Sequence, residues 1–369
     1  MKKNLNSCIL NFSCLVGSEL GNLKIINGFD WTTEDDINLD IGPISVIKKY
    51  QDEYYLASLD KLYKLHSLLD EDTSVHYSPK ANTGEIIGFD FFQEKTVIGF
   101  DGVVHIIKDN EIVAGFGNGK FNAFKMLRDG HVAVGGMNTE MSVFNILSHE
   151  KPVFTSKGEP NKGLSIPAKI NITSIEQDIE SDSIIYCGTK FNTVQLYDIR
   201  SNQRKAQLTA NFERGRSVTA LSSMATRKVI AGSNGGCLGI IDFKFVHKSK
   251  HNSSEFQTNY AKFKGFLAGT VSDLAVVNSV YCDVERAKAK DILLSTSIDG
   301  HLAVFDTGSR EMLKKIYLGK KPLSILVDNV NENPCDDLWG DLDALEQDMD
   351  RKRPASPLHC ESDKKVKKN

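Results

Sequence analysis

One pattern recurs seven times along the chain and constrains its fold more than any other feature. Each copy has a short apolar run, a small residue, a polar turn and an alternating apolar stretch that usually stops at a polar residue. Two looser copies lie at 54–67 and 96–109. In the other five copies the small residue precedes the polar stop by ten positions: Gly17 to Asn27, Gly135 to Asn145, Gly188 to Asp198, Gly232 to Asp242 and Thr296 to Asp306. Self-similarity of this kind predicts a repeat architecture.

Each copy predicts a β-hairpin. The segment before the turn is apolar and β-branched, as expected of a strand buried on both faces. The segment after the turn alternates, as in Val194-Gln195-Leu196-Tyr197, and this period of two is typical of a strand. Asp-Gly or Gly-Gly pairs in several turns, such as 299–300, supply the positive φ of a tight hairpin. A further strand precedes most hairpins, which gives a unit of about 40–45 residues, the size of a propeller blade.

The sequence therefore predicts an all-β fold, a seven-bladed WD-type β-propeller over residues 1–330. The segment 322–329, "PLSILVDN", is typical of a leading strand, but no hairpin follows it. We expect this strand to join the first blade and close the ring, since closure removes exposed sheet edges. A β-sandwich with an ordinary tail is the alternative. The longer gaps between copies predict insertions near 151–168, 203–215, 247–262 and 283–290.

Composition and motifs limit the classes of function. The net charge of −3 resides entirely in residues 332–369, which carry ten acids and seven bases. A neutral body argues against broad coating of nucleic acid. The seven cysteines are scattered without a C-x-x-C pair, which favours a reduced compartment, cytosol or nucleus. No apolar run approaches the length of a membrane span. Because the common catalytic motifs are also missing, we expect no catalytic residue, no cofactor and no metal.

Basic residues crowd the stretch that follows the strand "LYDIR", where only Glu213 opposes them. The candidate residues are Arg200, Arg204, Lys205, Arg214 and Arg216. Arginine binds phosphate in bidentate fashion. If these side chains share a face, they predict a contact with RNA or with a ribonucleoprotein particle. A solvated loop between strands is the alternative.

Residues 331–369 differ from the rest in composition, and we expect them to be a flexible, largely disordered tail. The first half is acidic and carries apolar side chains at helical spacing. This pattern predicts a linear motif that orders in a partner's groove, with the candidate residues Asp337, Leu338, Trp339, Leu342 and Leu345. A helix that packs on the rim of the same protein is the alternative.

The second half of the tail is basic. Two Lys/Arg clusters lie ten residues apart, and such clusters are typical of nuclear import or of nucleic-acid contact. The spacing favours a bipartite import signal made of Arg351, Lys352, Arg353, Lys364, Lys365, Lys367 and Lys368. A solvated tail without a specific role is the alternative.

Several stretches carry a resemblance to a known family. They are "KFNTVQLYDIRSNQRKAQL" (190–208), "KVIAGSNGGCLGIIDFK" (228–244), "KFKGFLAGTVSDLAV" (262–276), "LLSTSIDGHLAVFDTGSREMLKKIYLGKKPLSILVDN" (293–329) and "DDLWGDLD" (336–343). In these stretches the chain resembles the nucleolar WD-repeat proteins known as Nop-seven-associated factors. The resemblance extends over 184–343, whereas only the blade rhythm continues before it. The chain departs from the general WD-repeat pattern because no blade ends in Trp-Asp.

The resemblance implies a non-catalytic scaffold of large (60S) ribosomal subunit assembly in the nucleus and nucleolus. Such a protein would bind the pre-60S particle as a monomer, contacting assembly factors, ribosomal proteins and ribosomal RNA. A hexameric AAA-type ATPase would later release it, with the tail motif helping to recruit that ATPase. An adaptor propeller of a chromatin or ubiquitin-ligase complex is the alternative, and a propeller enzyme is a third.

Overall fold

The computed structural model describes most of the repeat region of the 369-residue chain. The described residues are 12–28, 31–65, 73–79, 84–117, 119–148, 150–158, 170–201, 203–246, 260–265, 267–282 and 288–328. The chain divides into two units, Met1–Val330 and Asn331–Asn369, and all described residues belong to the first. The residues of the expected partner motif and import signal, from Asp337 to Lys368, lie outside the described residues.

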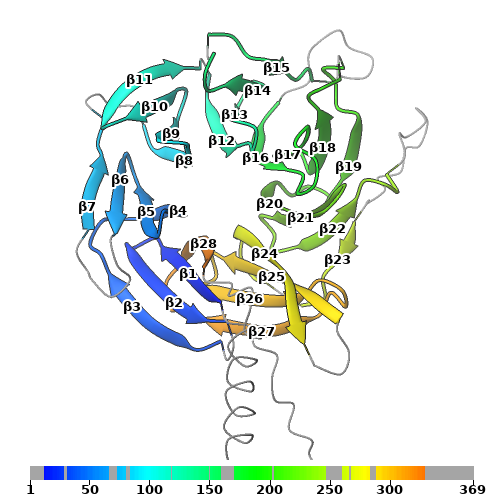
Figure 1. Ribbon diagram of the computed structural model, residues 1–369. Coiled ribbons are helices and arrows are strands. Elements are labelled where there is room, and N and C mark those ends of the chain that lie inside the picture. Colours follow the sequence, from blue (N-terminus) through cyan, green and yellow to red (C-terminus); the bar gives the residue numbers. More distant parts are fainter. Residues whose placement is uncertain are drawn as a thin grey trace, which may run out of the picture. The chain divides into compact units, whose positions relative to one another are not determined.

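The described residues of the first unit form seven four-stranded antiparallel sheets arranged as a ring (Figure 1). The seven-bladed all-β propeller predicted from the sequence is confirmed. From the axis outward, blade 1 consists of β28 (Pro322–Asp328), β1 (Ser13–Ser18), β2 (Asn22–Asn27) and β3 (Thr33–Asn38), and blade 2 of β4 (Ile44–Tyr50), β5 (Glu53–Ser58), β6 (Lys61–Leu65) and β7 (Thr73–Tyr77). Blade 3 consists of β8 (Ile86–Phe92), β9 (Lys95–Phe100), β10 (Val104–Lys108) and β11 (Glu111–Phe116). Blade 4 consists of β12 (Phe121–Met126), β13 (His131–Gly136), β14 (Thr139–Asn145) and β15 (Phe154–Thr155).

The remaining three blades follow the same order. Blade 5 consists of β16 (Ile172–Gln177), β17 (Ile184–Thr189), β18 (Thr193–Asp198) and β19 (Leu208–Asn211). Blade 6 consists of β20 (Val218–Ala225), β21 (Lys228–Ser233), β22 (Leu238–Asp242) and β23 (Ala261–Lys262). Blade 7 consists of β24 (Val271–Cys282), β25 (Lys288–Ser297), β26 (His301–Asp306) and β27 (Met312–Tyr317). The stretch 203–215, expected to be an insertion, contains β19, so it supplies the regular fourth strand of blade 5 instead.

The small residue of the repeat lies where neighbouring blades come closest. Gly188 is in the second strand of blade 5, and a Cβ atom there would lie 2.7 Å from Cγ1 of Val218 in blade 6. Gly232 stands in the same relation to Val271 of blade 7, at 2.6 Å. The core lies between blades, where apolar side chains of both sheets interdigitate. The repeated small residue therefore allows the sheets to pack at close range.

The C-terminal strand closes the ring. β28 pairs antiparallel with β1, and Gly17 stands opposite Ser324 in this pairing. Asp328, at the end of β28, is tied to blade 2: the Lys49 ammonium lies 2.8 Å from its carboxylate, and the Tyr54 hydroxyl donates to the same carboxylate. The closing strand is thus held by its own blade and by the next one.

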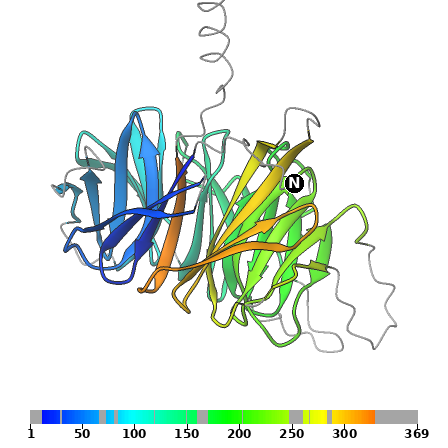
Figure 2. The ribbon, with the colours of Figure 1, turned by 90° about the horizontal axis from the view of Figure 1, so that it is seen from below.

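The two faces of the ring are defined by chain direction (Figure 2). Four antiparallel strands return the chain to the face on which each blade began. We call this the start face, and it carries the turn between the second and third strands and the linker to the next blade. The opposite end face carries the turns between first and second strands and between third and fourth strands.

Candidate binding surface on the start face

The five basic residues expected to form one contact lie in two places. Arg200, Arg204 and Lys205 are in the loop between β18 and β19, whereas Arg214 and Arg216 are in the linker from β19 to β20. β19 runs antiparallel to β18 from Leu208 to Asn211, so the two groups flank opposite ends of this strand. The structure therefore does not bring the five side chains together.

The residues of the β18–β19 loop make contacts within the protein. The guanidinium of Arg204 donates to the carbonyl of Thr155 (2.7 Å), and the carbonyl of Arg204 accepts from Lys157 N (2.8 Å). These bonds join blade 5 to the outer strand of blade 4. Arg200 lies 3.6 Å from the carboxylate of Asp198, and Lys205 is exposed. Arg204 thus connects two blades in addition to any contact it makes with a partner.

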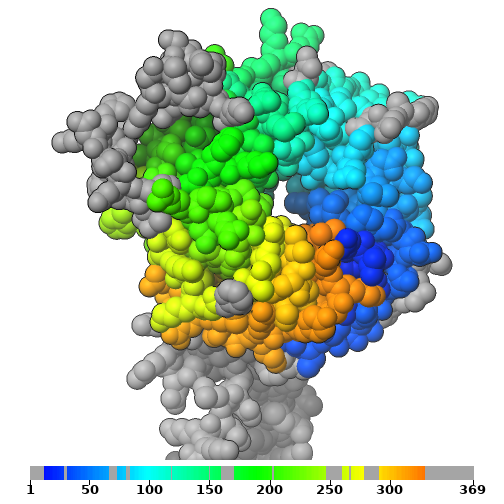
Figure 3. All heavy atoms as spheres, turned by 180° about the vertical axis from the view of Figure 1, so that it is seen from behind, coloured from blue at the N-terminus to red at the C-terminus, as the bar shows by residue number. Residues whose placement is uncertain are grey.

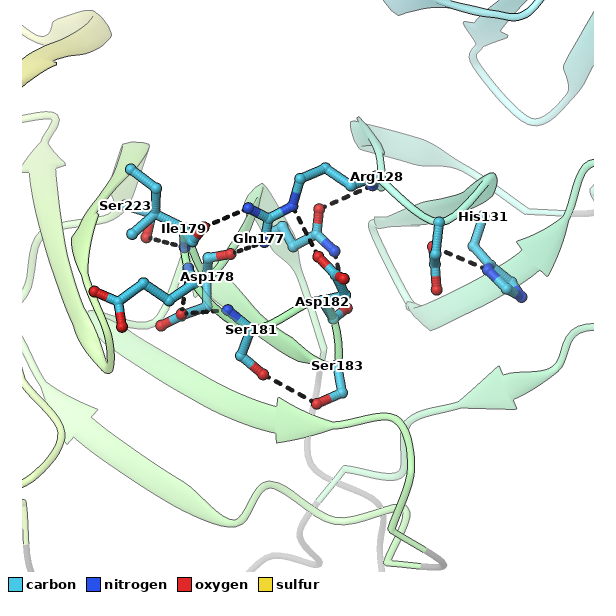
Figure 4. A network of polar contacts seen from close by, with 11 residues as sticks. Arg128, His131, Gln177, Asp178, Ile179, Ser181, Asp182, Ser183 and Ser223 are labelled. Carbon is cyan, nitrogen blue, oxygen red and sulfur yellow. Dashed lines mark hydrogen bonds and ion pairs between the residues drawn. The ribbon is translucent and has the colours of Figure 1, made fainter.

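On the end face, a polar network connects blades 4, 5 and 6 (Figure 4). Asp178 is fully buried in the turn between β16 and β17, and its carboxylate accepts from the backbone N–H groups of Glu180, Ser181 and Arg227 and from the Tyr186 hydroxyl. Arg128 reaches from blade 4 to this turn and donates to the Asp178 and Ile179 carbonyls. The polar groups of this network are satisfied by one another.

The inner strands of all seven blades line a channel with a cavity of about 360 Å³, and the space-filling view shows a hollow at the centre of the ring (Figure 3). Its charges pair between neighbouring blades: Lys48 with Asp90 at 3.0 Å, and Lys125 with Glu176 at 2.7 Å. Asp273 accepts from the backbone N–H groups of Ile325 and Leu274. Burial raises the pKa of Asp273 to about 6, although these N–H groups and the lysines favour its ionised form. The charged groups of the channel are therefore largely engaged within the protein, whereas the buried hydroxyls of Ser174 and Ser272 have no hydrogen-bond partner among the described residues.

The start face has a different character. Five of its seven turns between second and third strands carry a large apolar side chain that is 41–64% exposed. These side chains are Leu20, Leu59, Met137, Phe191 and Ile298. In blades 3 and 6 the same turn contains Asp101-Gly102 and Asn234-Gly235-Gly236. Since the five residues sit at equivalent places in different blades, they form a recurrent feature of one face.

Exposed basic side chains accompany the apolar residues of blades 4 and 5 and continue into the linker to blade 6. Lys120 lies in the linker to blade 4, Lys190 in the β17–β18 turn, and Arg214 and Arg216 in the linker to blade 6. We call the surface made by these basic residues and their apolar neighbours the tip surface: Lys120, Met137, Lys190, Phe191, Arg214 and Arg216. It contains two of the five predicted basic residues.

Sequence reasoning missed the apolar part of this surface. The signal was present, because each of the five apolar residues follows the small residue of its repeat by two or three positions, as Phe191 follows Gly188. Polar residues and glycine dominate such turns, so a large apolar residue there is unusual. The turns were expected to be polar because polar residues and glycine are the usual signal of a hairpin.

The described residues contain neither a metal-binding cluster nor a membrane-spanning helix. No group of three or more His, Cys, Asp and Glu side chains could hold a metal ion in this part of the chain. No helix within the same ranges is long and apolar enough to cross a membrane.

Comparisons with known proteins support the fold and suggest a relative. No protein-family model matches the chain. The chain is similar to WD repeat-containing protein 74 of Bos taurus, with 25% identity over 234 residues, which are 58% of this chain and 54% of the bovine protein. The chain thus spans about half the length of this relative. Among solved structures it is similar to the computationally designed Ika8 protein, with a TM-score of 0.51, 15% identity, and coverage of 76% of this chain and 89% of the designed one. The second likeness concerns the fold alone.

Proposed function

We propose that the protein is a non-catalytic scaffold in the assembly of the large ribosomal subunit, acting in the nucleus and nucleolus on the pre-60S particle. The observation that carries this proposal is the resemblance of residues 184–343 to Nop-seven-associated factors. Its support is the similarity to WD repeat-containing protein 74 and the propeller fold. A rigid ring that presents loops on two faces suits a platform for several partners.

Within this proposal the parts of the chain divide the work. The ring contacts assembly factors, ribosomal proteins and ribosomal RNA, and the protein sits in the particle as a monomer. In the tail, the basic clusters serve nuclear import, and the motif around Trp339 is recognised by the AAA-type ATPase that releases the protein. No catalytic residue or cofactor takes part.

Native purification of the tagged full-length protein tests the proposal. We expect large-subunit precursor RNA and large-subunit ribosomal proteins to co-purify. Recovery of histones or of a ubiquitin-ligase scaffold in their place would reject it and favour an adaptor propeller. In the same cells, a tagged chain that ends at residue 330 should lose nuclear accumulation, as should the full chain with its seven import-signal residues changed to alanine. An unchanged nuclear signal in both would reject the role given to the tail.

A further inference from the structure

We propose that the tip surface binds an acidic segment of a partner protein that also carries apolar side chains. This inference goes beyond the function proposed above, because it concerns the chemistry of one surface and holds for any complex in which the propeller serves. It rests on the continuity of the surface, on its charge and on the exposure of its apolar residues.

Backbone hydrogen bonds connect the tip surface from blade 4 to blade 6. Met137 N donates to the Lys120 carbonyl (3.0 Å), and Met137 also forms a bridge with Asn171. Asn171 in turn accepts from Lys190 N (2.9 Å). The turn that holds Phe191 is bonded to the next linker, because Phe212 N donates to the Asn192 carbonyl (2.7 Å). The exposed side chains therefore belong to one continuous stretch of the start face.

The charge of this stretch favours an acidic partner. It carries four exposed basic side chains. Of the acids beside it, Asp101 in the turn of blade 3 is exposed, whereas Glu213 and Glu140 are engaged within the protein. Glu213 accepts from the Ser233 hydroxyl (2.5 Å), and Glu140 accepts from Gly158 N (3.1 Å). Charge complementarity of this kind steers a partner and fixes its orientation.

The apolar side chains favour a protein over RNA. Bases stack on aromatic rings, but Met137 and the equivalent Leu20, Leu59 and Ile298 offer no ring. Methionine and leucine gain by burial against apolar groups of a partner. Phe191 can serve either partner, so Met137, the other apolar residue of the tip surface, decides between them.

Leu59, in the equivalent turn of blade 2, shows that a large apolar residue occupies this turn although its backbone conformation is strained. Its φ is +52°, at the first position of a two-residue hairpin turn, where glycine is the favoured residue. A bulky residue is strained in this conformation, and its exposed side chain gains little from the core. Strain that the fold does not require points to a role in recognition.

A phage-displayed library of random short peptides, selected on the full-length protein, tests the proposal. We expect the enriched peptides to combine several Asp or Glu residues with Phe, Trp or Leu. Their affinity for the Phe191→Ser variant should be about tenfold weaker, as for the loss of a central apolar contact. Arg216→Glu should weaken the same peptides, and added salt should reduce their binding to the wild type. Phe245→Ser is the matched control, because Phe245 is exposed on the end face.

Three results would overturn the proposal. The selected peptides have no excess of negative charge, or they bind the two start-face variants as well as the wild type. Alternatively, the library yields no peptide while oligouridylate binds in a manner that depends on Lys190 and Arg216. The last result would assign the surface to RNA. Because the substituted side chains are exposed, circular dichroism and thermal melting should show that all variants keep the fold.

Discussion

The two faces of the ring use their polar and apolar side chains in opposite ways. On the end face, Asp178 and Arg128 hold turns of neighbouring blades together, and their donors and acceptors face one another. On the start face, Met137, Phe191 and their equivalents are exposed and pair with nothing in the core. The polar network of the end face thus contributes side chains to folding, while the apolar turn residues of the start face present side chains that are largely outside the core. The end face also has exposed apolar side chains, as at Leu147 and Phe245, but on the start face they recur at the equivalent turn of five blades.

The energetic contrast follows from burial. A buried carboxylate with several donors leaves them unsatisfied when it is removed, which costs several times the value of an exposed contact. An exposed apolar side chain loses little when it is replaced by a polar one. Substitutions on the two faces should therefore differ in what they change, stability on the end face and binding on the start face.

The largest effect is expected for Asp178→Ala. This change removes the acceptor of three backbone N–H groups and of the buried Tyr186 hydroxyl. Leaving these donors without an acceptor should lower the free energy of unfolding by about 3–5 kcal/mol. Urea denaturation followed by tryptophan or far-ultraviolet signals measures the loss. The affinity for partners of the tip surface should remain unchanged in the molecules that stay folded.

Asp182→Ala is the matched control for Asp178→Ala. Asp182 lies in the same turn and pairs with Arg128 at 2.9 Å, but its side chain is 64% exposed. An exposed ion pair contributes less than about 1 kcal/mol. Equal losses for the two variants would contradict the view that the buried carboxylate organises the end face.

The sequence predicts the ring well because blade formation depends on local signals. The fixed distance from Gly188 to Asp198 encodes both the close approach of the next blade and the length of a hairpin. The closing strand β28 was predictable for a similar reason, since an apolar strand without a hairpin needs a partner sheet.

The candidate site was harder to predict because it depends on strand direction. Arg204 and Arg214 are ten positions apart in sequence, but a short strand, β19, lies between them and carries the chain across the blade. Conversely, Lys120 and Lys190 come from distant parts of the chain, and backbone hydrogen bonds through Met137 and Asn171 place them on neighbouring blades of one face. Closeness in sequence gave a cluster that the fold separates, whereas the local signature of the assembled surface was confined to the apolar residues of the turns.

A smaller effect on the free energy of unfolding is expected for the buried carboxylate of Asp273, which lines the channel between the two faces. Its carboxylate has two backbone donors, whereas that of Asp178 has four donors in all. Burial raises the pKa of Asp273 from 3.8 to about 6, so the folded state favours the protonated form. The resulting stabilisation is complete below about pH 3.8 and is lost as the pH rises through 6. The stability of the wild type relative to Asp273→Asn should fall by about 2–3 kcal/mol over this range.

Urea denaturation of both proteins at pH values on either side of this range measures the change. The amide introduced by Asp273→Asn does not titrate, so the variant removes this contribution and leaves the other titrating groups in place. A difference that stays constant with pH, or that grows in favour of the wild type as pH rises, would contradict the assignment. Such a result would mean that a further charged group in the channel stabilises the ionised form of Asp273.

The smallest effect on stability is expected for the double variant Met137→Ser and Phe191→Ser. Both side chains are exposed, so the free energy of unfolding should change by less than about 0.5 kcal/mol. Phe212→Ala provides the contrast, because Phe212 lies in the adjacent linker but is fully buried, and its loss should cost about 3–5 kcal/mol. A large loss for the double variant would mean that the apolar tips support the fold, and the difference between the two faces would vanish. Unchanged stability with lost peptide binding would mean that the start face is built for recognition.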